Sequence, residues 1–117
     1  MNKKINIGLI GVGPHAEENL IPAIRLNLDS TIFGVYSSKK ERLHELQNKY
    51  QIKKGFTSWK DLILCRDIAC VFICGSPQFH ETIIIFCIQH SMPFFVEKPP
   101  LIPKYRNSIL VDEITNF

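Results

Sequence analysis

The sequence predicts an α/β fold in which a doubly wound parallel sheet lies between two layers of helices. Three observations support this: strand-like segments that are apolar on both faces, helix-like segments between them, and a glycine-rich turn after the first strand. The chain has 117 residues, of which 45% are hydrophobic and 21% are charged, as expected for one core. We therefore expect residues 1–117 to form a single three-layer αβα domain.

Five segments have the composition of strands. Four of them consist mainly of β-branched, aromatic or other apolar residues, and a short one follows the second predicted helix. They cover residues 5–10 (INIGLI), 31–36 (TIFGVY), about 55–56 (GF), 69–74 (ACVFIC) and 93–96 (PFFV). Strands that are apolar on both faces belong to parallel sheets covered by helices.

Helices are predicted between the strands. They cover about 15–27, 39–50, 58–65 and 78–90, with a last one near 104–116. Pro22 falls inside the first helix, where a proline removes a backbone donor. We expect it to kink that helix or to leave one backbone carbonyl without its helical partner.

The turn after the first strand, Gly11-Val12-Gly13-Pro14-His15-Ala16, fits the pattern G-x-G-x-x-G/A of Rossmann-type domains. In this pattern Gly11 allows a tight turn, Gly13 lets a pyrophosphate approach the backbone, and Ala16 lets helix and strand pack closely. The phosphate would lie at the helix N-terminus. A glycine-rich turn that binds no ligand is the alternative.

Two residues inside this turn need their own interpretation. Pro14 has no N–H to offer a phosphate, although proline is tolerated in the first turn of a helix. His15 either supplies a side-chain contact to the phosphate or is an ordinary exposed histidine. Both are counted among the candidate cofactor-binding residues.

The end of the second strand should contact the adenosine ribose. NAD-specific sites carry an acidic residue there, whereas residues 35–42 (VYSSKKER) contain no carboxylate before Glu41. Ser37, Ser38 and Lys39 instead offer hydroxyl donors and positive charge, which suits the 2′-phosphate of NADP. The sequence therefore predicts NADP as the preferred cofactor and NAD as the alternative. One of the serines could also cap the next helix.

Composition argues against several other functions. The net charge is +3, and the lysines are scattered without the interleaved aromatics of nucleic-acid binders. No apolar run approaches the ~18 residues of a membrane helix. The four cysteines at 65, 70, 74 and 87 form no C-x-x-C pair, which favours buried thiols over a metal site or disulfides. We expect a cytoplasmic protein that binds neither nucleic acid nor membrane.

Two later segments, "FICGSPQFH" (72–80) and "PFFVEKPP" (93–100), each follow a buried strand with polar residues. Together with the glycine turn, they resemble the N-terminal nucleotide-binding domain of the glucose-fructose oxidoreductase and inositol dehydrogenase (Gfo/Idh/MocA) family. The resemblance runs from about residue 5 to residue 103. Its most specific part is the Glu-Lys-Pro sequence after the last strand.

The resemblance implies roles for particular residues. In that family the lysine of Glu-Lys-Pro lies beside the nicotinamide and the reacting carbon of a sugar, cyclitol or related alcohol, so Lys98 is the candidate catalytic residue. A lysine that acts as a base near neutral pH needs a lowered pKa. Glu97 would orient the loop or contact the nicotinamide ribose. Ser76, Pro77 and His80 would line the nicotinamide side of the cleft.

The length differs from that of the family, whose members carry a C-terminal domain that supplies the substrate pocket. We expect this chain to be the dinucleotide-binding domain of an oxidoreductase, without that substrate domain and with little turnover alone. The alternatives are a dinucleotide-binding or sensor module without catalysis, and a domain that binds another phosphate ligand or none.

The last predicted strand also suggests a homodimer. Phe94, Phe95 and Val96 are too apolar for an exposed sheet edge. We expect either the final helix or a second copy of the chain to cover this edge.

Overall fold

The computed structural model describes residues 4–75 and 80–96. The strands are β1 (Ile5–Ile10), β2 (Ser30–Tyr36), β3 (Lys54–Phe56), β4 (Cys70–Ile73) and β5 (Phe94–Val96). The helices are a π-helical turn (Ala16–Leu20), α1 (Ile21–Leu26), α2 (Lys40–Tyr50), α3 (Trp59–Leu64) and α4 (His80–Gln89). All strand pairs are parallel, in the order β3-β2-β1-β4-β5. The predicted α/β fold is confirmed.

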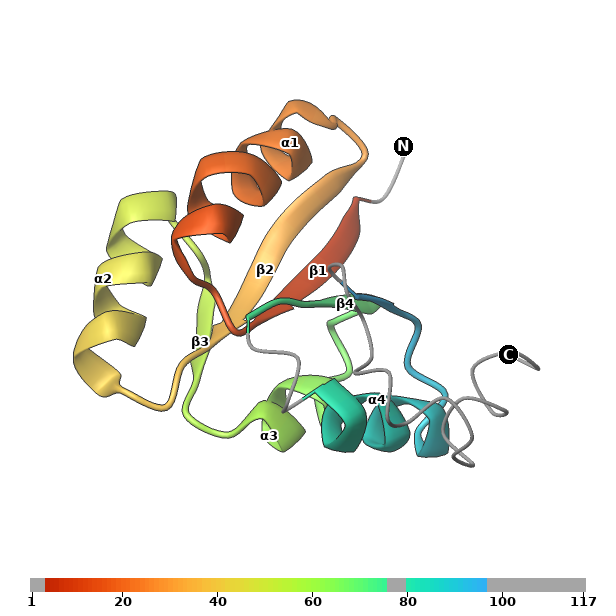
Figure 1. The fold of residues 1–117 in the computed structure, drawn as a ribbon. Coiled ribbons are helices and arrows are strands. Elements are labelled where there is room, and N and C mark those ends of the chain that lie inside the picture. Colours follow the sequence, from red (N-terminus) through yellow and green to blue (C-terminus); the bar gives the residue numbers. More distant parts are fainter. Residues whose placement is uncertain (1–3, 76–79, 97–117) are drawn as a thin grey trace.

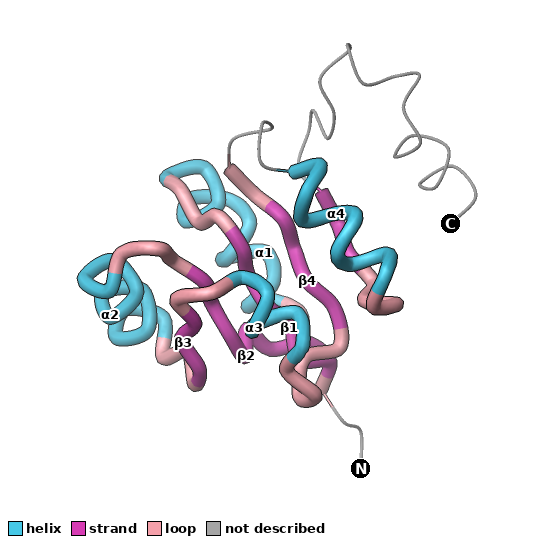
Figure 2. The backbone as a smooth tube through the Cα atoms, turned by 90° about the horizontal axis from the view of Figure 1, so that it is seen from below, coloured by secondary structure: helices cyan, strands magenta, loops and turns pink. Residues whose placement is uncertain are grey.

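The helices cover the sheet in two layers. Helices α1 and α2 lie on one face, and α3 and α4 lie on the other (Figure 1). Figure 2, turned by 90°, shows α3 and α4 in front of the strands. No helix in either described stretch of the chain is long and apolar enough to cross a membrane.

The order of the strands changes direction at β1, in the centre of the sheet. The chain runs outward from β1 to β3 and then returns to place β4 on the other side of β1. Connections from β1 and from β4 therefore leave the sheet toward opposite faces. In doubly wound sheets ligands bind beside the carboxyl ends of the strands at this switch point.

Each face of the sheet buries its own core. On the side of α1 and α2, Leu9 and Val35 are fully buried, and on the side of α3 and α4, Val71 and Ile73 are fully buried. Because neighbouring residues of a strand point to opposite faces, both sets of positions must be apolar. This explains the continuous apolar runs of the central strands.

The disturbance predicted at Pro22 takes the form of a π-helical turn. Pro22 lies at the start of α1, and just before it the N–H of Ile21 donates to the carbonyl oxygen of Ala16, five residues back. Proline has no N–H, and its ring cannot pack against the carbonyl four residues earlier in a regular helix. The wider turn accommodates that ring.

Strand β1 has its predicted bounds, and several other elements differ from the predictions by one or two residues. Strand β2 begins one residue earlier, at Ser30, and β4 is shorter, at Cys70–Ile73. Ser58 caps α3 by accepting a hydrogen bond from the N–H of Asp61 at 3.4 Å. The helix predicted near 104–116 lies outside the described residues.

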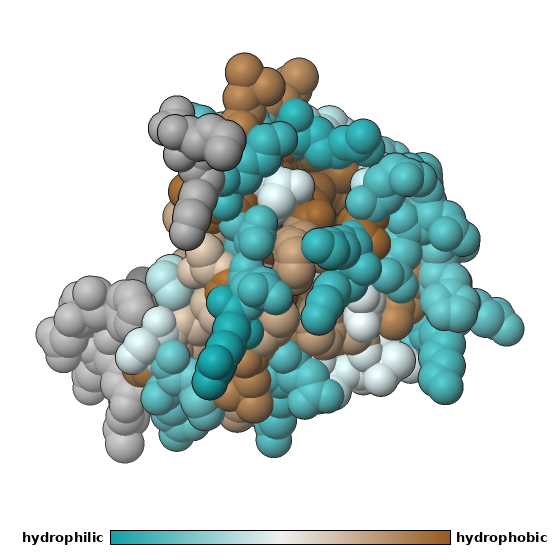
Figure 3. Space-filling model, turned by 180° about the vertical axis from the view of Figure 1, so that it is seen from behind, coloured by the Kyte–Doolittle hydropathy of each residue, from teal (hydrophilic) through white to brown (hydrophobic). Residues whose placement is uncertain are grey.

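The face seen from behind carries both polar and apolar surface (Figure 3). From behind, hydrophilic side chains dominate the side that carries α2, and hydrophobic surface shows in the middle and at the top, near the loop after α1 (Figure 3). Leu26 and Leu28 are 83% exposed, and Phe95 on the edge strand β5 is 59% exposed. Phe95 packs against Phe72 with ring centroids 4.9 Å apart.

Candidate functional site

The carboxyl ends of β1, β2 and β4 border a cavity of about 520 Å³. That volume lies within the range of roughly 300–1,000 Å³ that is usual for small-molecule sites. The cavity opens at the switch point of the sheet, on the side of α3 and α4. Its walls are formed by Ile10, Gly11, Tyr36, Ser38, Trp59, Cys74, Gly75, Thr82 and Ile83.

Two glycines allow the backbones after β1 and β4 to touch. Gly11 has φ +81° and Gly75 has φ +88°, a region that side chains rarely adopt. A Cβ at Gly11 would collide with the carbonyl oxygen of Cys74, and a Cβ at Gly75 would lie 3.1 Å from the carbonyl oxygen of Gly11. The tight turn predicted at Gly11 is confirmed. The partner glycine, Gly75, was missed, although a glycine directly after a buried strand was its signal.

Gly13 faces open space. No described atom lies within 4 Å of the position that a Cβ would take there. The carbonyl oxygen of Gly13 accepts the N–H of Glu17 at 3.1 Å, so Gly13 stands at the start of the helix. Ala16 is buried, as close packing of helix and strand requires. This arrangement leaves room for a group that approaches the backbone at Gly13, and it fits the predicted phosphate turn.

His15 is exposed beside this turn. The amide Nδ2 of Asn19 lies 3.2 Å from Nδ1 of His15 and donates to the carbonyl oxygen of His15 at 3.3 Å. A hydrogen bond from that amide makes Nδ1 the accepting nitrogen of the ring.

The segment after β2 begins beside the cavity. The hydroxyl of Ser37 accepts the N–H of Lys39 at 3.2 Å, and the N–H of Ser37 donates to Phe56 at 3.1 Å. Ser38 is exposed and lines the cavity together with Gly11. The N-cap residue of α2 is Lys39, which makes no side-chain cap hydrogen bond, so neither serine caps this helix.

A charge cluster that the sequence did not reveal joins the glycine turn to α2. The carboxylate of Glu17 accepts hydrogen bonds from Arg42 at 2.6 Å, from Tyr50 at 2.7 Å and from Lys49 at 3.2 Å. Arg42 also donates to the carbonyl oxygen of Val12 at 3.5 Å. The hydrogen bonds from Arg42 and then Tyr50 lower the pKa of Glu17 to about 2. Glu17 is therefore ionised and neutralised by α2.

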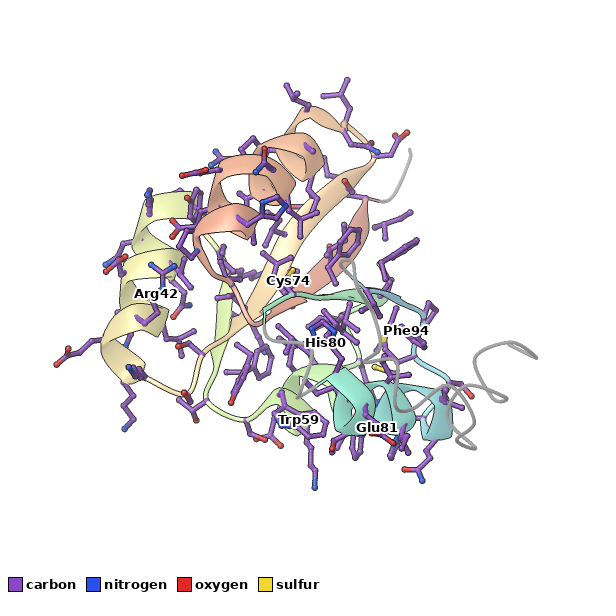
Figure 4. All side chains as sticks on the ribbon, viewed as in Figure 1. Arg42, Trp59, Cys74, His80, Glu81 and Phe94 are labelled. Carbon is purple, nitrogen blue, oxygen red and sulfur yellow. The ribbon has the colours of Figure 1, made fainter. Side chains whose placement is uncertain are left out.

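His80 is not part of the cavity wall. Its side chain is buried, with Nε2 3.3 Å from the carbonyl oxygen of Cys74. Figure 4 shows His80 beside the end of β4, on the side of α4. The other residues predicted around the nicotinamide, Ser76, Pro77, Glu97 and Lys98, lie outside the described residues.

Aromatic and aliphatic side chains form the far wall of the cavity. Trp59, from the first turn of α3, packs edge-on against Phe86 of α4, with ring centroids 5.3 Å apart (Figure 4). Tyr36, the last residue of β2, and Ile83 of α4 also belong to this wall. These wall residues were missed, because nothing in their local sequence indicates that α3 and α4 meet beside β2.

The chain matches the sequence model of the family described as "Oxidoreductase family, NAD-binding Rossmann fold", over residues 5–108. It is 26% identical over 99 residues to myo-inositol 2-dehydrogenase of Thermotoga maritima, covering 81% of this chain and 28% of that protein. It is 22% identical over 114 residues to inositol 2-dehydrogenase of Corynebacterium glutamicum, covering 97% of this chain and 34% of that protein. The chain thus spans about a third of these relatives.

Solved structures show the same fold. Apo scyllo-inositol dehydrogenase from Lactobacillus casei superposes with a TM-score of 0.86 at 20% identity, over 99% of this chain and 35% of that one. An oxidoreductase from Agrobacterium radiobacter, solved in complex with NAD+, L-tartaric acid and magnesium, has a TM-score of 0.85 at 18% identity. That match covers 97% of this chain and 33% of that one.

Proposed function

This chain belongs to the Gfo/Idh/MocA oxidoreductase family with its NAD-binding Rossmann fold, and from that membership we propose that it is the cofactor domain of a hydride-transferring enzyme. The cofactor is NADP(H), or NAD(H) as the alternative, and the substrate is a sugar, cyclitol or similar alcohol or carbonyl compound. The observation that carries this proposal is the cavity at the switch point, which is lined by Gly11, the first glycine of the turn. Two residues further on, the backbone of Gly13 faces open space.

The described residues fit the adenosine half of a dinucleotide. The pyrophosphate would lie at the turn Gly11–Ala16, where Gly13 leaves space. Ser38, on the same cavity, would contact the ribose, and the base would pack against the apolar wall that includes Trp59 and Ile83. When bound, the nicotinamide would give or accept the hydride, and this chain would bind and orient the cofactor.

NADP preference is supported by charge. Ser37, Ser38 and Lys39 follow β2 without an acidic residue, and a 2′-phosphate would accept charge-assisted hydrogen bonds from them. Arg42 is held by Glu17 and Glu45, with both nitrogen–oxygen distances 2.6 Å. Its charge is therefore already compensated, and we assign the recognition of the phosphate to the serines and Lys39.

We assign the residues beside the nicotinamide, the reacting end of the cofactor, from family membership. Lys98 would hydrogen-bond the reacting hydroxyl or exchange a proton with it, and Glu97 would orient the loop. Ser76 and Pro77 would line the nicotinamide side. We propose that residues 1–117 form one domain and that the substrate pocket comes from outside it, because the inositol dehydrogenases matched are about three times as long.

We place the protein in the cytoplasm. Within residues 4–75 and 80–96 no disulfide joins Cys65, Cys70, Cys74 or Cys87, as is usual in a reducing compartment. Burial raises the pKa of Cys87 to about 12, so that this thiol stays protonated and unreactive.

The chain's single tryptophan gives a direct test, because Trp59 lines the cavity. Titration with NADPH and NADH should quench Trp59 emission by energy transfer to the reduced nicotinamide, and calorimetry should give the matching affinities. Adenosine 2′-monophosphate should compete with NADPH. A chain that binds neither dinucleotide at millimolar concentration would contradict the proposal.

A further inference from the structure

His80 is the only buried polar or charged residue in the described stretches 4–75 and 80–96, with 1% of its surface exposed. Burying a polar ring is unfavourable unless its hydrogen bonds are replaced. The ring is buried and is not among the described residues that line the cavity. The residue on which His80 acts most directly is Cys74, to which its ring is hydrogen-bonded.

The hydrogen-bond partner determines which ring nitrogen carries the proton. Nε2 lies 3.3 Å from the carbonyl oxygen of Cys74, and a carbonyl oxygen only accepts, so Nε2 is the donor. Nδ1 has no hydrogen-bond partner among the described residues. The bond to Cys74 is therefore the interaction that orients the imidazole.

That carbonyl occupies a critical position at the switch point. It is the atom that a side chain at Gly11 would strike, and the N–H of Cys74 donates to Ile10 at 2.8 Å. Cys74 thus meets the end of β1 through both of its backbone polar atoms. Gly75, with φ +88°, follows directly and packs on the backbone of Gly11.

We propose that His80 is a positioning residue for the dinucleotide site. Its Nε2–H holds the Cys74 carbonyl in the orientation that packs the Cys74–Gly75 backbone against Gly11, and this contact sets the shape of the phosphate turn. The effect of His80 on ligand affinity rests on the proposed function, because it acts on the turn that would hold the pyrophosphate.

Two variants of similar size separate hydrogen bonding from packing. In His80→Gln the amide nitrogen can take the place of Nε2 and donate to Cys74, whereas His80→Met fills a similar volume without a donor. Thermal unfolding identifies variants that remain folded, and calorimetry measures their affinity for NADPH, NADH and adenosine. Adenosine carries no phosphate, so a displaced phosphate turn leaves its binding unchanged.

We expect His80→Gln to bind both dinucleotides within a few-fold of the wild type. His80→Met should bind them about tenfold more weakly, as expected for the loss of one buried hydrogen bond. Adenosine affinity should be equal in the two variants. Nitrogen-15 NMR of the imidazole in the wild type should show the Nε2–H tautomer.

Equal dinucleotide affinities in the two variants, or a parallel loss of adenosine affinity in His80→Met, would overturn the inference and leave the proposed function intact. An Nδ1–H tautomer would overturn it even if His80→Met fails to fold. If the wild type binds neither dinucleotide, the proposed function is wrong and the inference fails with it.

Discussion

The guanidinium of Arg42 lies 2.6 Å from the carboxylate of Glu17, and the same nitrogen lies 3.5 Å from the carbonyl oxygen of Val12. One side chain of α2 therefore holds both the glycine turn and the helix that follows it. In Figure 4 Arg42 lies on α2 on the side of the first helix.

Glu17→Gln should lower the free energy of unfolding by roughly 2 kcal/mol at neutral pH, because it removes charged hydrogen bonds from a largely buried site. The folded-state pKa of Glu17, about 2, lies below its ordinary value of 4.5. The stabilisation is therefore fully present above pH 4.5 and is lost as the pH falls toward 2. Urea unfolding of the wild type and the variant across this range measures the difference.

Glu18→Gln is the matched control, since Glu18 is the exposed neighbour in the same turn. It should leave the free energy of unfolding unchanged within about 0.5 kcal/mol. If the stability difference between Glu17→Gln and the wild type does not depend on pH between 2 and 4.5, the ion pair does not stabilise the fold in solution.

The two glycines of the turn should respond differently to substitution. Gly11→Ala should destabilise the fold by about 2 kcal/mol or more, because φ is +81° and the new Cβ meets the Cys74 carbonyl. Gly13→Asp should leave the melting temperature nearly unchanged, because its Cβ points into open space. It should weaken dinucleotide binding at least about a hundredfold, because a carboxylate would face the pyrophosphate.

Thermal unfolding and calorimetry, run on the same preparations, check this contrast. Gly13→Ala serves as the uncharged control and should keep more of the affinity than Gly13→Asp. Undiminished binding by a folded Gly13→Asp variant would place the ligand elsewhere.

Ser37→Asp should shift the cofactor preference from NADPH toward NADH. A carboxylate repels the 2′-phosphate but accepts a hydrogen bond from a 2′-hydroxyl, so NADPH affinity should fall about tenfold or more. An aspartate can still accept the N–H of Lys39, which the hydroxyl accepts now at 3.2 Å, so the local backbone should be retained.

The affinities come from parallel titrations with the two dinucleotides. Ser91→Asp adds the same charge at an exposed position beyond α4 and should leave the NADPH-to-NADH ratio unchanged. A wild type that already binds NADH as tightly as NADPH would show that the NADP preference is wrong.

The exposed edge strand β5 leads us to expect self-association of the chain. Phe95 is 59% exposed on a strand at the end of the described sheet, next to Phe72. We expect a symmetric dimer at micromolar concentration, and Phe95→Lys should shift it to monomer, because a charge on an edge strand opposes pairing. Light scattering gives the mass. A wild-type monomer whose amides at 94–96 exchange slowly would indicate that the edge is covered within one chain.

Local patterns in the sequence were sufficient to predict the helices and strands of the described residues and the glycine turn after β1. β1 was predicted with its observed bounds, Ile5–Ile10, and the turn at Gly11 lies where the motif placed it. Pro22 correctly indicated that the first helix is irregular, although not that the irregularity is a π-helical turn. These features depend on periodicity and backbone sterics within a few residues, which a single sequence displays directly.

The tertiary structure alone decided how the site is assembled. The strand order β3-β2-β1-β4-β5 brings the carboxyl ends of separate strands together. For this reason Gly75 packs on Gly11, and Trp59 lines the cavity. The ion pair between Arg42 and Glu17 forms for the same reason. His80 was expected along the cleft, yet its ring is buried against Cys74. Contacts between residues far apart in the chain depend on which faces pack against one another, and no local pattern in one sequence specifies that pairing.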